Sequence, residues 1–293
     1  MQKEKENIFG NYREFVDVAF PKEKLLIDPI LSNFYRPFSL RLSWLLYRRG
    51  IKPNAVTIAQ IFIGLIGCLM ISSFFTKISF FIGLIFLHFA YLLDCIDGEI
   101  ARATKTESLQ GVFLDKFSHA LLMPAIFMSV GFFYSKYSID NQDFIILVSL
   151  LASYSTFNPV NRLVTTIVNQ LINKKHFKQY KIGNYKQYRE NNPKLNIFYK
   201  NKSKMISFLK SKVIINFSYN FFRHVTYLAL ITFNFILDLF GTPSEILVIL
   251  WLMLGLALIS KELLMLFIVL FTNRIELSFQ KTLSNLADFE IKK

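Results

Sequence analysis

Long blocks of apolar residues, separated by shorter polar or basic stretches, make up most of the sequence. The blocks lack the strict alternation of half-buried strands, and as helices they are long enough to cross about 30 Å of hydrocarbon. The pattern therefore predicts an all-α integral membrane protein. Its six transmembrane helices are expected near residues 55–75, 78–97, 111–134, 143–170, 216–240 and 244–272.

Residues 1–54 mix apolar and basic positions at roughly helical spacing, as in Phe34, Phe38 and Leu45 among arginines. This spacing is typical of an amphipathic helix on the cytoplasmic membrane face, and the alternative is a helix packed on the protein itself. We expect a single domain organised as a juxtamembrane segment (1–54), a six-helix membrane domain (55–272) and a cytoplasmic tail (273–293). The segment "FNPVNR" (157–162) predicts a kink in the fourth span.

Composition and charge agree with a membrane protein. Hydrophobic residues make up 53% of the chain, its net charge is +14 and its mean hydropathy is +0.38. Residues 1–54 carry 10 Lys and Arg and residues 172–212 carry 12, against one each around Lys77 and Lys136. The positive-inside rule then places both termini, the 98–110 turn and the basic 172–212 loop in the cytoplasm. The expected location is the inner (cytoplasmic) membrane of the cell, with the active site on the cytoplasmic side. Anionic lipid accounts for the basic loop better than nucleic acid does.

Two further features exclude other classes. Cys68 and Cys95 both fall in or beside apolar segments, so they form neither a disulfide framework nor a metal-binding pair. The first 15 residues lack an apolar core and a cleavage site, so no signal peptide is expected.

Acidic residues gather where the second predicted span ends and the third begins. Asp94 and Asp97 share one helix face, and Asp115 and His119 share another. A short turn would bring both faces together at the cytoplasmic edge. Crowded carboxylates repel one another unless a cation is present, and such ligands suit Mg²⁺, Mn²⁺ or Ca²⁺. Two such cations could assist phosphoryl transfer. The alternative is an ion network of Asp97, Arg102, Asp115 and Lys116.

Other charged residues are predicted at the same depth of the membrane. Arg162, Arg223 and Lys261 lie near the cytoplasmic ends of spans four, five and six. Charges inside a membrane are usually functional, although Arg223 and Lys261 could instead extend to the interface. We interpret the three as a pocket for a phosphorylated or otherwise anionic acceptor.

The spacing D-x2-D-G-x2-A-R-x8-G-x3-D resembles the signature of the CDP-alcohol phosphatidyltransferase family. In this chain it is carried by Asp94, Asp97, Gly98, Ala101, Arg102, Gly111 and Asp115. The segment "GIKPNAVT" (50–57) is also similar to the start of the family's first span. Beyond the third span the likeness is one of topology.

The resemblance implies an enzyme that transfers a phospho-alcohol group from a CDP-alcohol to an acceptor hydroxyl and releases CMP. Two divalent cations, Mg²⁺ or Mn²⁺, would be held by the motif aspartates. The CDP moiety would be bound by Asp94, Gly98, Ala101, Arg102 and Gly111, with help from Asn54 and Thr57. The acceptor would be a lipid, a polyol or a phosphorylated compound, and family members are commonly homodimers.

The chain departs from the family pattern at position 119, where His119 replaces a fourth aspartate that binds metal and is the proposed base. A neutral histidine can ligate metal and accept a proton. The alternatives are that His119 has no part in proton transfer, or that activity has been lost. Two other classes are considered: a transporter, for which we find no inverted repeat, and a non-catalytic scaffold that binds nucleotide.

Overall fold

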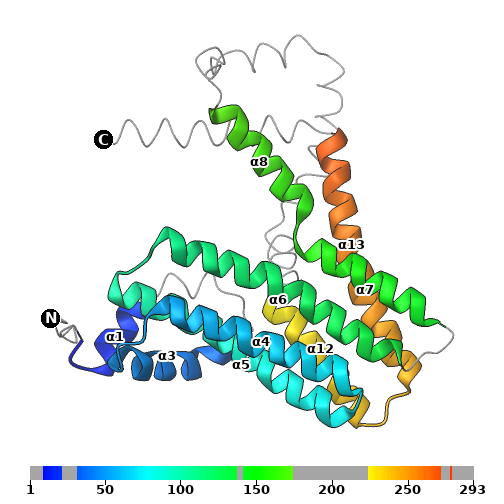
Figure 1. Cartoon of the computed structure of the whole chain (residues 1–293), viewed down its shortest axis with the longest axis horizontal. Helices are drawn as coiled ribbons and strands as arrows, with labels where there is room; N and C mark the ends of the chain where they lie inside the picture. Colours follow the sequence, from blue (N-terminus) through cyan, green and yellow to red (C-terminus); the bar gives the residue numbers. More distant parts are fainter. Residues whose placement is uncertain (1–8, 22–31, 137–140, 174–223, 272–277, 279–293) are drawn as a thin grey trace, which may run out of the picture. The chain divides into compact units, whose positions relative to one another are not determined.

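The computed structural model describes residues 9–21, 32–136, 141–173, 224–271 and 278, and helices dominate these ranges (Figure 1). Two compact units are distinguished: residues 1–157 with 220–256, and residues 158–219 with 257–293. The first unit contains α1 (Tyr12–Ala19), α3 (Ser32–Arg48), α4 (Pro53–Phe74), α5 (Lys77–Thr104), α6 (Leu109–Ser135), α7 (Gln142–Thr156), α12 (His224–Leu239) and the first half of α13 (Ser244–Phe271). The second unit contains α8 (Pro159–Asn173) and the remainder of α13.

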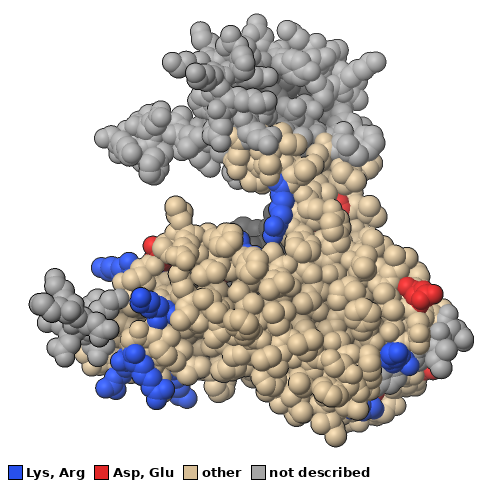
Figure 2. Space-filling view, viewed as in Figure 1, with Lys and Arg blue, Asp and Glu red and all other residues tan. Residues whose placement is uncertain are grey.

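The predicted membrane class is confirmed by the length and composition of these helices. Five segments within the described ranges can cross a membrane: Pro53–Phe74, Lys77–Thr104, Leu109–Ser135, Gln142–Asn169 and Ser244–Val269. A shorter apolar helix covers Val225–Leu239, and the start of the predicted 216–240 span lies outside the described residues. The chain is therefore a multi-pass, all-α membrane protein, and the count of six spans stays a prediction. Figure 2 shows a wide area of the visible face that carries neither acidic nor basic side chains, as contact with lipid requires.

The fourth apolar segment is interrupted where "FNPVNR" predicted a kink. Helix α7 ends at Thr156 and α8 begins at Pro159. Between them, Asn158 has a φ of 48°, in the left-handed region that asparagine tolerates better than most residues do. Proline is well placed at the start of the new helix, because its missing N–H would have no intrahelical partner there.

Capped turns make α4, α5 and α6 antiparallel neighbours. Thr76 begins α5 through a reciprocal capping box with Ser79. The helix ends at Lys105, whose φ of 52° closes it in a left-handed cap. Three residues later, the Ser108 side chain accepts a hydrogen bond from the Gly111 N–H at 3.1 Å and so begins α6. The acidic residues therefore lie on either side of a short, structurally defined turn.

Glycines allow α4 and α5 to approach closely. A Cβ atom built on Gly83 would lie 2.7 Å from the Gly67 carbonyl oxygen, and one built on Gly67 would lie 2.9 Å from the Gly83 carbonyl oxygen. Real Cβ atoms do not approach that closely, so both positions require glycine. Small residues at a crossing increase van der Waals contact between membrane helices, where lipid provides no hydrophobic driving force.

Helix α3 is fastened to α5 by a buried charge. The Glu99 side chain is fully buried and pairs with Arg36 Nη1 at 2.8 Å. It also accepts hydrogen bonds from the hydroxyls of Ser39 (2.7 Å) and Ser43 (2.5 Å). On the other side of α3, the Phe34 and Phe38 rings are 74% and 57% exposed. The helix thus packs on the protein through a polar face and exposes aromatic side chains, so its contact with the membrane stays a prediction.

A second polar connection joins three helices of the first unit. The Tyr35 hydroxyl of α3 lies 2.5 Å from His88 Nδ1 of α5, and His88 Nε2 lies 2.8 Å from the Thr232 hydroxyl of α12. Burial raises the pKa of Tyr35 to about 12, so the phenol stays neutral at physiological pH. This hydrogen-bonded chain connects α3, α5 and α12 and so fixes α12 relative to α3.

Candidate active site

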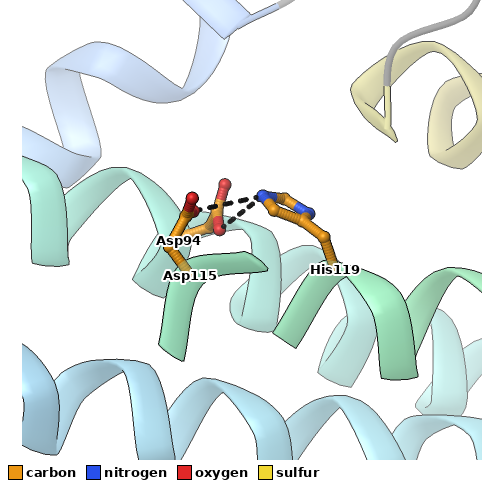
Figure 3. Close-up of side chains that lie close together, drawn as sticks. All are labelled: Asp94, Asp115 and His119. Carbon is orange, nitrogen blue, oxygen red and sulfur yellow. Dashed lines mark ion pairs between the residues drawn. The ribbon is translucent and has the colours of Figure 1, made fainter. Parts of the chain in front are cut away.

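His119 lies beside two carboxylates that come from neighbouring helices. Its Nε2 atom is 3.4 Å from Asp94 Oδ1 of α5 and 3.4 Å from Asp115 Oδ1, one turn earlier on α6 (Figure 3). One ligand atom from each residue lies within 4.8 Å of the other two. The expected convergence of the two helix faces is therefore present, with imidazole nitrogen and carboxylate oxygen directed to one place.

Helix α4 supplies hydrogen bonds to the same carboxylates. Thr57 Oγ1 donates to Asp97 Oδ2 at 2.6 Å, and Gln60 Nε2 donates to Asp94 Oδ1 at 3.0 Å. The two donors are three residues apart on α4, and the two acceptors are three residues apart on α5. The later donor, Gln60, pairs with the earlier acceptor, Asp94, as expected for antiparallel helices. Asp97 does not belong to the three-residue cluster, and its carboxylate is directed toward Thr57.

The residues expected from the family signature to bind nucleotide lie on the helices that carry this cluster and on α4. A Cβ atom on Gly111 would lie 3.4 Å from Asn54 Oδ1, so the start of α6 lies beside the start of α4. A Cβ atom on Gly98 would lie 3.0 Å from Arg102 Nη1. Ala101 and Thr57 lie on the same two helices, α5 and α4. The residues expected to bind CDP thus come from α4, α5 and α6 of one compact unit.

Arg102 also contacts the N-terminal helix α1. Its Nε donates to the Ala19 carbonyl oxygen at 2.7 Å, at the C-terminal end of α1. Phe15 and Ala19 pack in the same place against Leu40 and Ala103. The guanidinium expected to bind phosphate therefore also connects α1 to the helix that carries the acids.

The alternative ion network is present only in part. Lys116 Nζ lies 3.3 Å from Asp115 Oδ2, and both side chains are well exposed. Asp97 accepts from Thr57, and Arg102 donates to a backbone carbonyl. Exposed pairs contribute at most about 1 kcal/mol, so the contact with Lys116 does not explain why the acids gather here.

The residues expected to bind the acceptor belong to the second unit or lie outside the described residues. Arg162 lies in α8, and Arg223 is not described. Lys261 Nζ lies 2.5 Å from Asn158 Oδ1 and 3.2 Å from Glu262 Oε1. Lys261 is therefore held within the second unit by an amide and a neighbouring carboxylate.

Sequence reasoning overlooked two polar residues that matter here, Gln60 and Glu99. Gln60 stands within the first predicted span, and an amide in such an apolar stretch is a signal that the sequence offered. The structure shows that its side chain is fully buried. Glu99 lies inside the family signature at a variable position, and its partner Arg36 is 63 residues away in sequence. No local pattern could have paired them.

The fold and the cluster together define a class in outline: an all-α membrane protein with a candidate metal site of carboxylates and an imidazole at a helix turn. The family model for CDP-alcohol phosphatidyltransferases matches residues 51–183, a segment that begins just before α4 and contains α4 to α8. This match confirms the resemblance to the CDP-alcohol phosphatidyltransferase family that the signature residues predicted. A comparison with curated proteins gave no match.

The match supports a general class of reaction. Enzymes of this family are transferases that move a phospho-alcohol group from a CDP-alcohol to an alcohol acceptor in a membrane, and they typically use divalent metal ions. The cluster of Asp94, Asp115 and His119 fits such an ion, because its ligand atoms are close together and offer oxygen and nitrogen donors.

Proposed function

We propose that this protein is a CDP-alcohol phosphotransferase that uses two divalent cations, with His119 as the general base. The observation that carries the proposal is the position of His119 Nε2, 3.4 Å from both Asp94 and Asp115. The expected proton acceptor, His119, therefore lies in the same site as the expected metal ligands Asp94 and Asp115.

The cations would be held by Asp94, Asp97 and Asp115, and His119 would join them as a ligand only in the alternative in which its imidazole does not accept the proton. Bound there, the cations would supply charge neutralisation of the diphosphate and of the departing CMP. Thr57 and Gln60 hold Asp97 and Asp94 in place through their hydrogen bonds. Asn54, Gly98, Ala101, Arg102 and Gly111 form the surface proposed for the CDP moiety.

The chemistry requires one proton transfer at His119. The acceptor hydroxyl loses its proton to the imidazole as its oxygen bonds to the phosphorus that carries the alcohol. The bond from that phosphorus to CMP breaks, and CMP leaves with the electron pair. A neutral imidazole is a stronger base than an ordinary carboxylate, with an unperturbed pKa of about 6.5 against about 4. General base catalysis typically contributes about 10²- to 10⁴-fold.

The acceptor and the orientation of the protein belong to the same proposal. Arg162, Arg223 and Lys261 are proposed to bind an anionic or phosphorylated acceptor. The basic segments 1–54 and 172–212 favour cytoplasmic termini and a cytoplasmic active site. The product would be a membrane phospholipid or a polyol phosphodiester.

The test is CMP release by the purified, detergent-solubilised chain with a panel of CDP-alcohols, in Mg²⁺ or Mn²⁺. We expect release with one donor, lost in Asp115→Asn and in His119→Ala. Loss in Asp115→Asn alone would retain the transferase and reject His119 as the base. Metal-dependent CDP binding without CMP release from any donor would instead support a nucleotide-binding scaffold.

A further inference from the structure

Gln60 is a buried amide beside the acidic cluster. Its side chain lies in the middle part of α4 and has no exposed surface. Its Nε2 donates to Asp94 Oδ1, the same oxygen that lies 3.4 Å from His119 Nε2. One amide group therefore touches the carboxylate at which α4, α5 and α6 meet.

The other end of this amide lacks a hydrogen bond. Gln60 Oε1 is buried and has no hydrogen-bond partner among the residues that the structure describes. Because Oε1 and Nε2 are bonded to the same carbon, this oxygen lies next to the contact with Asp94. Leaving a buried polar atom unsatisfied costs about 1–3 kcal/mol, and a bound ion or water is a common explanation. Polar groups inside membrane helices are usually functional.

The metal ligands available at this site indicate a role for the Gln60 amide oxygen. With histidine at position 119, one oxygen ligand and one negative charge of the family pattern are missing. The amide oxygen of glutamine is an accepted ligand of hard divalent cations and adds no charge. An amide N–H that holds a ligating carboxylate is likewise a common arrangement around metals.

We propose that Gln60 is a further residue of the metal centre, which orients Asp94 through Nε2 and offers Oε1 to a divalent cation. The proposal rests on the metal-dependent function proposed above and adds a neutral oxygen ligand from α4. It assigns a role to a residue outside the family signature.

The test measures Mn²⁺ binding directly, by electron paramagnetic resonance of free Mn²⁺ during titration of the full, detergent-solubilised chain. Gln60→Leu should weaken Mn²⁺ binding about 10- to 100-fold, as is typical when groups around a metal site are removed. Gln60→Glu keeps an oxygen at this position and should bind Mn²⁺ at least as tightly as the unsubstituted protein. CMP release is measured in parallel with the same preparations.

Asn234→Leu is the matched control. Asn234 is also a buried amide, in α12, whose Nδ2 donates to the Leu247 carbonyl oxygen at 3.1 Å. Its Oδ1 too is without a hydrogen-bond partner in the part of the chain that the structure covers. Thermal unfolding of each variant shows that it is folded, and Asn234→Leu should leave Mn²⁺ affinity unchanged.

The outcomes separate this inference from the proposed function. Unchanged Mn²⁺ affinity in Gln60→Leu, or an equal loss in Asn234→Leu, overturns the role of Gln60 even if CMP is released. A Gln60→Glu protein as weak as Gln60→Leu would assign the loss to the missing Nε2 donor and so overturn the role of Oε1. Gln60-dependent Mn²⁺ binding without CMP release supports the inference and counts against the transferase. Absence of Mn²⁺ binding in the unsubstituted protein overturns both.

Discussion

His119 Nε2 on α6 lies 3.4 Å from Asp94 Oδ1 on α5. The proposed base and a proposed metal ligand therefore lie close together although they belong to two different helices. Replacing His119 by aspartate would restore the carboxylate of the family pattern. We expect His119→Asp to keep CMP release and to shift the metal preference toward Mg²⁺, because a hard, charged oxygen replaces nitrogen. His119→Ala should lose about 100-fold or more in kcat, as expected for a lost base. Initial rates in each metal provide the measurement, and a His119→Ala protein as active as the unsubstituted one would contradict the assignment.

We expect Thr57 to affect the reaction rate only through its hydrogen bond to Asp97. Thr57→Val removes the 2.6 Å hydrogen bond to Asp97 and keeps the shape of the side chain. A hydrogen bond to a charged group contributes about 1.5–3 kcal/mol, so we expect roughly a tenfold or greater fall in kcat/KM. Thr165→Val is the control, because the Thr165 hydroxyl donates to the Asn161 carbonyl oxygen of its own helix, α8. Equal effects of the two substitutions on the rate would reject a specific role for Thr57.

Removing the metal should lower the thermal stability of the protein as well as its rate of CMP release. A ligand that binds only the folded state stabilises it by about 2.7 kcal/mol at one hundred times its Kd. We therefore expect Mn²⁺ to raise the Tm of the chelator-treated protein and to restore its CMP release. Asp94→Asn should show a much smaller rise, since one cluster carboxylate is lost. An equal rise in both proteins would place the stabilising ion elsewhere.

The buried pair between Arg36 and Glu99 predicts a strong effect on stability. Arg36→Met leaves the Glu99 carboxylate, which has no exposed surface, without its cation. Breaking one side of a buried pair costs about 3–5 kcal/mol. The double variant Arg36→Met with Glu99→Gln should recover part of this loss. Unfolding in detergent measures both, and Lys116→Ala, which breaks an exposed pair, should change stability by less than about 1 kcal/mol.

Arg162 tests the proposed acceptor pocket. Arg162→Ala should raise the KM for the acceptor more than the KM for the CDP-alcohol, because a cation would be lost from the acceptor alone. Steady-state kinetics with each substrate varied in turn give the two constants. Lys136→Ala, at the opposite predicted side of the membrane, serves as the control. Equal changes in both KM values would reject the assignment.

The sequence predicted the parts of the molecule that depend on local pattern. Long apolar runs indicated membrane helices, and the i, i+3 and i, i+4 spacing of the acids indicated shared helix faces. The predicted second span ended at 97, whereas α5 continues to Thr104. The prediction stopped early because Asp97, Glu99 and Arg102 lower the hydropathy of that stretch. The helix continues there because Thr57, Arg36 and Ala19 satisfy those polar groups.

The unpredicted parts depend on contacts between residues distant in sequence. Asp94 receives its hydrogen bond from a residue 34 positions earlier, and Arg102 donates to one 83 positions earlier. Neither contact leaves a trace in periodicity or composition. They require the antiparallel register of α4 and α5 and the docking of α1, which become known only from the fold.

The pairing of Arg36 with Glu99 also has a consequence for biosynthesis. A carboxylate that enters the membrane unpaired is costly. Chains emerge from the ribosome N-terminus first, and α3 precedes α5 in sequence. The guanidinium and the two serine hydroxyls that bind Glu99 are therefore already synthesised when α5 is inserted. The order of the helices along the chain thus allows the charge to be neutralised as it arrives, without waiting for any later part of the protein.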